Sequence, residues 1–152
     1  MKRLCLVVIV LLLGISLVCA AQNQRIASIV KVRGTVEVKT ASGVWSPAKE
    51  GMALDQNDSI RTGKESLAVL NLDGNAQTAT LEVKEKTELQ LTEMLANQQK
   101  GTQKTLLDLS LGNILIKAKK LHSDKSSFEV RTPTSVVAVR GTTFAVTVEA
   151  VE

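Results

Sequence analysis

Short apolar segments, each opened by a glycine, recur along this chain and constrain its fold more than any other feature. Three of them begin Gly34-Thr35-Val36, Gly112-Asn113-Ile114 and Gly141-Thr142-Thr143. Apolar residues follow at alternate positions, which predicts strands with one buried face. Glycine permits a positive φ or a close approach of the chain, as a corner requires. The recurrence therefore predicts an all-β fold that is coiled, solenoid-like or barrel- or sandwich-like, although the irregular spacing does not establish a true repeat.

The segments between these corners predict further strands. Asp73-Gly74 is a strong hairpin signal between two apolar runs. The segment 84–97 fits either an amphipathic helix or an alternating strand, and its neighbours favour a strand. Pro47 restricts the segment that begins at Trp45 to an edge strand or a connector. The other expected strands are 26–39 with a bend near Gly34, 67–72, 78–83, 106–111 and 113–118, the last two pivoting at Gly112.

The stretch from Thr132-Pro133 to Val146 contains an arginine and a glycine inside an apolar run. A buried cation without a partner is very costly, so Arg140 is expected to pair with a carboxylate or with carbonyls. Asp58 and Asp73 are the candidate partners. We expect Arg140-Gly141 to form a fixed, buried structural corner.

Composition argues against nucleic acid as a partner. The net charge is +4, and Lys2 and Arg3 at the N-terminus contribute two of these charges. The remaining basic residues are scattered, whereas nucleic-acid binders concentrate them in one footprint. Aromatic residues make up only 2% of the chain, so platforms for stacking bases or sugars are scarce. Trp45 is the one candidate platform.

The N-terminus has the pattern of an export signal. Met1-Lys2-Arg3 precedes an apolar run that ends near Cys19-Ala20. A basic start, an apolar core and a small-residue exit predict a signal helix over residues 1–20 with cleavage after Ala20. Lipidation of Cys19 and an uncleaved membrane anchor are the alternatives. The expected organisation is a signal peptide at 1–20, a polar lead at 21–25 and one β domain at 26–152.

This prediction places the protein in the periplasm or outside the cell, with membrane contact only through an uncleaved N-terminal segment. Both cysteines lie within the signal segment. The mature chain then has no disulfide and no cysteine metal ligand, and its core alone must hold it.

Chemistry-bearing residues are sparse. His122 is the single histidine and lies in a polar turn beside Ser123 and Asp124. Neighbours in a loop do not form a catalytic triad, which needs a nucleophile, a base and an orienting acid in three dimensions. Asp55, Asn57 and Asp58 lack the spacing of a calcium loop. The sequence predicts no catalytic residues, no metal and no cofactor.

One further motif, Ile60-Arg61-Thr62-Gly63, comes shortly before the run 67–72. In their order and spacing, this motif and those above resemble the FecR-type domain, an extracytoplasmic β domain of bacterial cell-surface signalling regulators and other exported proteins. The resemblance runs from about Ile26 to Val148. Asn57 stands where the family usually has glycine, a mild change because asparagine tolerates the left-handed region. The residues that carry the resemblance most specifically, and that we expect to be structural, are Arg61, Thr62, Gly63, Asp73, Gly74, Thr132, Pro133, Arg140, Gly141, Thr142 and Phe144.

The resemblance implies a β fold, an envelope location and an interaction with a protein or another cell-envelope component. Sigma-factor regulators of the family carry a cytoplasmic helical segment before a membrane span, and only Met1-Lys2-Arg3 precedes the apolar run here. The regulatory output of those members therefore does not carry over. The leading hypothesis is an exported, non-enzymatic binding module in envelope signalling or assembly. The alternatives are a glycan- or peptidoglycan-binding module that uses Trp45 and, less favoured, an enzyme that uses His122.

Overall fold

A computed structural model describes residues 23–24, 26–40, 42–73, 78–97, 100–119, 125–141 and 143–149. The regular structure in these residues is entirely β, which confirms the predicted fold class. No helix in the described ranges meets the length and hydropathy needed to cross a bilayer. The predicted signal helix at 1–20 lies outside them. The strands are β1 (Asn23–Gln24), β2 (Ala27–Arg33), β3 (Val36–Lys39), β4 (Trp45–Pro47), β5 (Ala53–Leu54), β6 (Ser59–Thr62), β7 (Leu67–Leu72), β8 (Ala79–Val83), β9 (Glu88–Asn97), β10 (Thr102–Ala118), β11 (Ser127–Arg131), β12 (Val136–Ala138) and β13 (Thr143–Val148).

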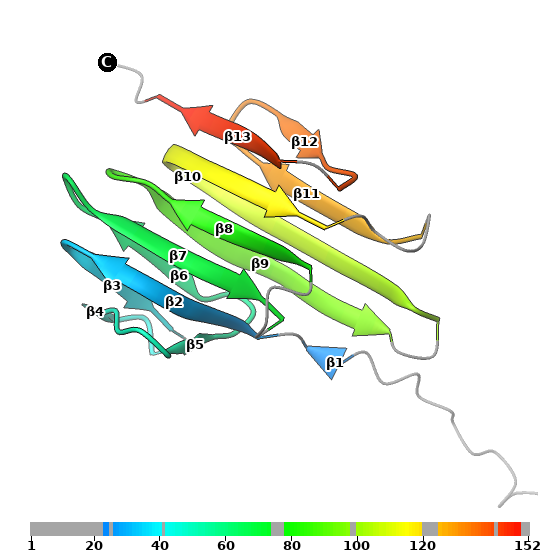
Figure 1. Ribbon diagram of the computed structural model, residues 1–152, viewed down its shortest axis with the longest axis horizontal. Coiled ribbons are helices and arrows are strands. Elements are labelled where there is room, and N and C mark those ends of the chain that lie inside the picture. The colour runs from blue at the N-terminus through cyan, green and yellow to red at the C-terminus, as the bar shows by residue number, and fades with distance from the viewer. Residues whose placement is uncertain are drawn as a thin grey trace, which may run out of the picture.

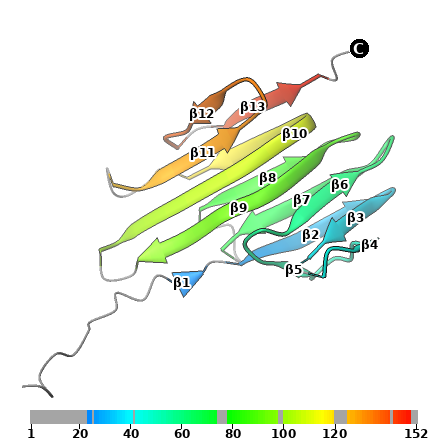
Figure 2. The same ribbon diagram turned by 180° about the vertical axis from the view of Figure 1, so that it is seen from behind.

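The strands form one sheet that curls back on itself as a half-barrel (Figures 1 and 2). The order along the sheet is β4-β3-β6-β9-β10-β8-β7-β2-β5. We call β4, β3, β6, β9 and the first half of β10 the first layer, which β11 and β12 extend. The second half of β10, with β8, β7, β2 and β5, is the second layer, which β13 extends.

The core lies between the inner faces of the two layers. Alternate residues of each strand point inward, as the period of two predicts. On β7 and β8 they are leucine, alanine and valine side chains with no exposed surface. Phe128, Leu107 and Leu109 fill the first-layer side near β11. With few aromatic residues, close packing of branched aliphatic side chains supplies most of the hydrophobic stabilisation.

β10 connects the layers as a single strand, where two strands were expected. Up to Leu111 it pairs with β9, and from Gly112 it pairs with β13 and from Ile114 also with β8. Gly112 has a φ of +98°, and a Cβ built there would lie 2.5 Å from the Thr87 Cα. The expected pivot at Gly112 is therefore present, as a bend within a continuous strand.

The chain also crosses between layers at three loops beside Gly112, which connect β2 to β3, β6 to β7 and β8 to β9. Buried hydroxyl groups join these loops, which we call the hydroxyl-linked corners. Thr35 N–H donates to Ser66 Oγ at 2.9 Å, and Thr87 N–H donates to Thr62 Oγ1 at 3.1 Å. Asn113 N–H donates to Thr87 Oγ1 at 2.9 Å. Strand pairing does not satisfy backbone groups at such corners, and the hydroxyls provide their partners.

Several local expectations are confirmed. The run 67–72 is β7, and β8 returns antiparallel to it from the predicted hairpin. The ambiguous segment 84–97 contains β9, a strand. Gly34 lies between β2 and β3 with a φ of +74°, and β4 with Pro47 is an edge strand. β1 lies in the segment expected to be a polar lead and pairs with the end of β9.

Candidate interaction surfaces

Thr62 and Gly63 belong to the hydroxyl-linked corners. Thr62 is buried, and its Oγ1 donates to the Lys84 carbonyl. Gly63 N–H donates to the Thr35 carbonyl at 2.9 Å, and the Gly63 carbonyl accepts from Lys86 N–H at 3.0 Å. These hydrogen bonds join neighbouring loops, and they engage the Thr62 hydroxyl and both backbone groups of Gly63 within the protein.

Arg61 points to the outer face of the first layer, beside the proposed platform Trp45. Its Nε donates to Glu37 Oε2 at 2.7 Å, and its guanidinium carbon lies 4.2 Å from the centre of the Trp45 ring. Lys39 Nζ also lies over that ring, at 5.0 Å. Cations are attracted to the negative face of an aromatic ring, so this cluster is stabilised within the protein itself. A sugar stacking on Trp45 would have to compete with these cations.

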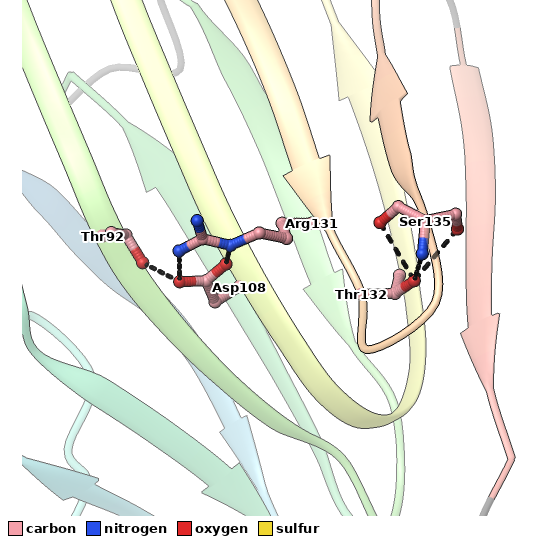
Figure 3. A network of polar contacts seen from close by, with 5 residues as sticks. All are labelled: Thr92, Asp108, Arg131, Thr132 and Ser135. Carbon is pink, nitrogen blue, oxygen red and sulfur yellow. Dashed lines mark hydrogen bonds and ion pairs between the residues drawn. The ribbon is translucent and has the colours of Figure 1, made fainter.

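Thr132 and Pro133 form a tight turn between β11 and β12 (Figure 3). Thr132 N–H donates to the Ser135 carbonyl at 2.8 Å, and Ser135 N–H donates to Thr132 Oγ1 at 3.0 Å. The threonine hydroxyl imitates a backbone acceptor, and proline fixes its own φ. The turn therefore holds its shape at the surface.

Asp108 and Arg131 make a two-point ion pair between the parallel strands β10 and β11, just before that turn (Figure 3). Arg131 Nε lies 2.5 Å from Asp108 Oδ1, and Nη2 lies 2.6 Å from Oδ2. Thr92 Oγ1 donates to Oδ2 at 2.6 Å from β9. The hydrogen bonds from Arg131 lower the pKa of Asp108 below its usual value, and those to Asp108 raise the pKa of Arg131. The pair braces β11, which holds the turn. Its residues were not singled out in the sequence, because only the pairing register brings them together.

A hollow of about 570 Å³ lies between the Thr132–Ser135 turn and β13. Leu111 and Val137 contribute to its lining, together with the chain from Ala145 to Glu149. Glu149 is the only charged residue among the described residues of this lining. A second hollow of about 290 Å³ lies on the other side of the turn, beside Asp108 and Arg131. The turn therefore stands between two recesses.

The prediction of a buried ion pair at Arg140 is wrong. Arg140 is exposed, and none of the ion pairs between described residues includes it. Asp58 Oδ2 instead accepts from Asp55 N–H at 2.8 Å, and Asp73 Oδ2 accepts from Thr78 Oγ1. The physical reason is alternation: Val139 is buried, so the next side chain points out of the corner.

The prediction of a fixed corner at Arg140-Gly141 holds in part. Gly141 has a φ of +64°, which marks a turn where the chain passes from the first layer to the second. Phe144 is partly buried and packs against the core, while Val146 is buried. Gly74, Thr142 and His122 lie outside the described residues.

The family-signature residues do not form one site. Thr62 and Gly63 lie with Thr132 and Pro133 at one end of the layers, because β6 and β11 both finish there. Asp73 follows β7 at the opposite end, with a φ of +66°, and Gly141 precedes the start of β13, also at that end. Within the described part of the chain, no group of three His, Cys, Asp or Glu residues could hold a metal ion.

A comparison with protein families identifies the chain. The family described as FecR protein matches residues 58–152, more than half of the sequence. The chain belongs to the FecR family. The match includes the hydroxyl-linked corner residue Thr62, the Thr132–Ser135 turn and β13, and the preceding segment with Gly34 and Trp45 lies outside it. No curated protein and no solved structure matches the chain significantly.

Proposed function

We propose that this FecR-family chain is an exported module that binds a protein or another cell-envelope component, in envelope signalling or assembly, and that it catalyses no reaction. Its membership of the FecR family is the observation that carries the proposal. The apolar N-terminal segment supports export, with the β domain on the outer side of the cytoplasmic membrane.

The surface around the Thr132–Ser135 turn is the contact surface that we propose. The turn lies within the matched family region and is braced by hydrogen bonds and by the nearby Asp108–Arg131 ion pair. A rigid, exposed loop on a sheet scaffold loses little conformational entropy on binding. The neighbouring hollow of about 570 Å³ is within the range of roughly 300–1,000 Å³ typical of ligand sites.

Site-specific photo-crosslinking in the producing cell tests this function. A photoreactive residue replaces Thr134, exposed in the turn, or Thr40, exposed after β3 at the opposite end of the first layer. We expect a discrete adduct with one envelope component from position 134 and none from position 40. Identical adducts from both positions, or no adduct from position 134 under conditions in which the protein is exported, would contradict the proposal.

The glycan hypothesis has a separate test. If Trp45 were a sugar platform, Trp45→Ala would abolish retention of the protein by purified cell wall. The cations over the ring lead us to expect unchanged retention.

A further inference from the structure

β13 is an edge strand that lacks the usual protection. It pairs with β10 on one side, and no described strand pairs with its other side. Exposed edges are normally shortened or carry charged residues, proline or a bulge, because unpaired backbone groups attract other strands. β13 has six residues in regular register and contains no charge and no proline.

The other edges of the described sheet have such protection. β4 has three residues and ends in Pro47, and β5 has only two residues. The part of β2 beyond β5 carries Lys31 and Arg33, and Glu50 Oε1 accepts from Val32 N–H at 3.0 Å. β12 has three residues. β13 is thus the exception among these edges of the described sheet.

The pairing register shows which backbone groups of β13 are free. The backbone groups of Asn113, in β10, and of Lys119, just after β10, point toward β8. The Asn113 carbonyl accepts from Lys84 N–H, and Lys119 N–H donates to the Thr78 carbonyl. The backbone N–H and C=O groups of successive residues in a strand point to opposite sides, so those of Gly112, Ile114 and Ile116 point toward β13. Their register partners are Val148, Val146 and Phe144. The N–H and C=O groups of the intervening residues Thr143, Ala145 and Thr147 therefore face outward.

The hollow of about 570 Å³ lies beside this free edge (Figure 1 shows β12 and β13 on the same side of β10). Leu111 and Val137 give it apolar surface, and Leu111 is 37% exposed. A strand added to β13 would direct every second side chain to the same face of the sheet. Apolar side chains at those positions fit a hollow whose only charged lining residue, among those described, is Glu149.

We propose that β13 binds an extended segment of a partner protein as an additional strand, with apolar side chains at alternate positions entering the hollow. This inference rests on the proposed binding function and specifies its chemistry. Backbone hydrogen bonds supply the affinity of strand addition, and the pockets for alternate side chains supply its specificity. The turn at Thr132–Ser135 forms the opposite wall of the hollow, which favours a single extended segment over the edge of a second whole domain.

Proline at position 145 is the sharpest test, because it removes only an N–H that faces outward and leaves the ladder to β10 intact. Ala145→Thr is the matched control, since it keeps the N–H and adds a β-branched side chain suited to strands. The probe is a fluorescent peptide of alternating valine and threonine, flanked by lysines for solubility. We expect saturable binding to the purified protein and to Ala145→Thr, and at least tenfold weaker binding to Ala145→Pro. Thermal unfolding checks that each variant is folded, and if Ala145→Pro is unfolded, Ala145→Lys replaces it and is expected to weaken binding.

Three results would overturn the inference. One is binding of the peptide to Ala145→Pro as tightly as to the unchanged protein, and another is no saturable binding at all. The third is a dimer of the unchanged protein that Ala145→Pro converts to a monomer, which would make a second copy the occupant of the edge. If the photo-crosslinked adduct at position 134 persists with Ala145→Pro, strand addition is wrong and the proposed function stands. Loss of that adduct with Ala145→Pro but not with Ala145→Thr supports both.

Discussion

At the scale of single residues, glycine has two separable roles in this fold. Gly112 combines a positive φ with crowding, because an added Cβ would also lie 2.6 Å from the Lys86 carbonyl oxygen. Gly43 has a φ of +75°, but an added Cβ would have no atom within 4 Å. Substitutions at Gly112 and Gly43 can therefore separate the cost of backbone strain from the cost of steric crowding.

Alanine at these two positions should have unequal effects. We expect Gly112→Ala to lower the free energy of unfolding by more than about 2 kcal/mol, since strain and overpacking add. Gly43→Ala should cost about 1 kcal/mol from strain alone. Urea unfolding followed by circular dichroism measures both, and equal losses would show that crowding at Gly112 is relieved by movement of the β8–β9 loop.

Arg140 should contribute little to stability. Because its side chain is exposed, Arg140→Ala should change the free energy of unfolding by no more than about 0.5 kcal/mol. Arg61→Ala is the comparison, and it should cost about 1 kcal/mol through the lost Glu37 and Trp45 contacts. If Arg140→Ala lowered the free energy of unfolding by about 3 kcal/mol or more, Arg140 would be in a buried ion pair, as the sequence suggested.

The two outcomes at Arg140-Gly141 show what a sequence can reveal at this scale. The backbone requirement of Gly141 was predictable, because a glycine that interrupts an apolar run usually serves a turn or a close approach of the chain. The direction of the Arg140 side chain was not, since it depends on which face Val139 presents to the core. Asn57, which stands where the family usually has glycine, has a φ of +71°, a left-handed conformation that asparagine tolerates.

At the scale of elements, the apolar pattern and the Asp73-Gly74 hairpin signal predicted β7 and β8, and the neighbouring strands favoured a strand for β9. It did not predict that β10 is one strand serving both layers, because the change of partners at Gly112 is a tertiary feature. The Asp108–Arg131 pair was missed for the same reason: it depends on the parallel register of β10 and β11, which are 23 residues apart at these positions.

This ion pair should make stability depend on pH. The pKa of Asp108 is lowered in the folded protein, so its contribution is present above the unfolded pKa of about 4 and is lost as pH falls through the folded value. We expect Arg131→Met to lower the free energy of unfolding only slightly at neutral pH, because Arg131 is half exposed and water screens the ion pair. The loss of stability caused by Arg131→Met should become smaller as the pH falls below about 4. Lys49→Met, at an exposed lysine, is the control, and its effect should not vary with pH in this window.

At the scale of the whole molecule, export is the premise of the proposed function. We expect mass spectrometry of the protein from its producing cell to give a chain that begins at Ala21, because cleavage after Ala20 fits the small-residue exit of the apolar run. A mass that includes a lipid on Cys19 would indicate acylation. A chain that retains Met1 would indicate an uncleaved anchor.

The two layers, the braced turn and the unprotected edge together form a β scaffold with one open edge strand, at which we propose that a partner binds. Family membership is shown by comparison, and the partner-binding role is proposed from it. The location of the open edge became visible only in the fold, because the sequence of β13 is that of an ordinary half-buried strand.

Amide hydrogen exchange of the free protein, resolved by residue with NMR, tests the open edge most directly. We predict fast exchange at Thr143, Ala145 and Thr147, whose N–H groups face outward, and slow exchange at Phe144, Val146 and Val148, which bond to β10. Uniform protection along all of β13 would show that its outer edge is already covered and would contradict the account.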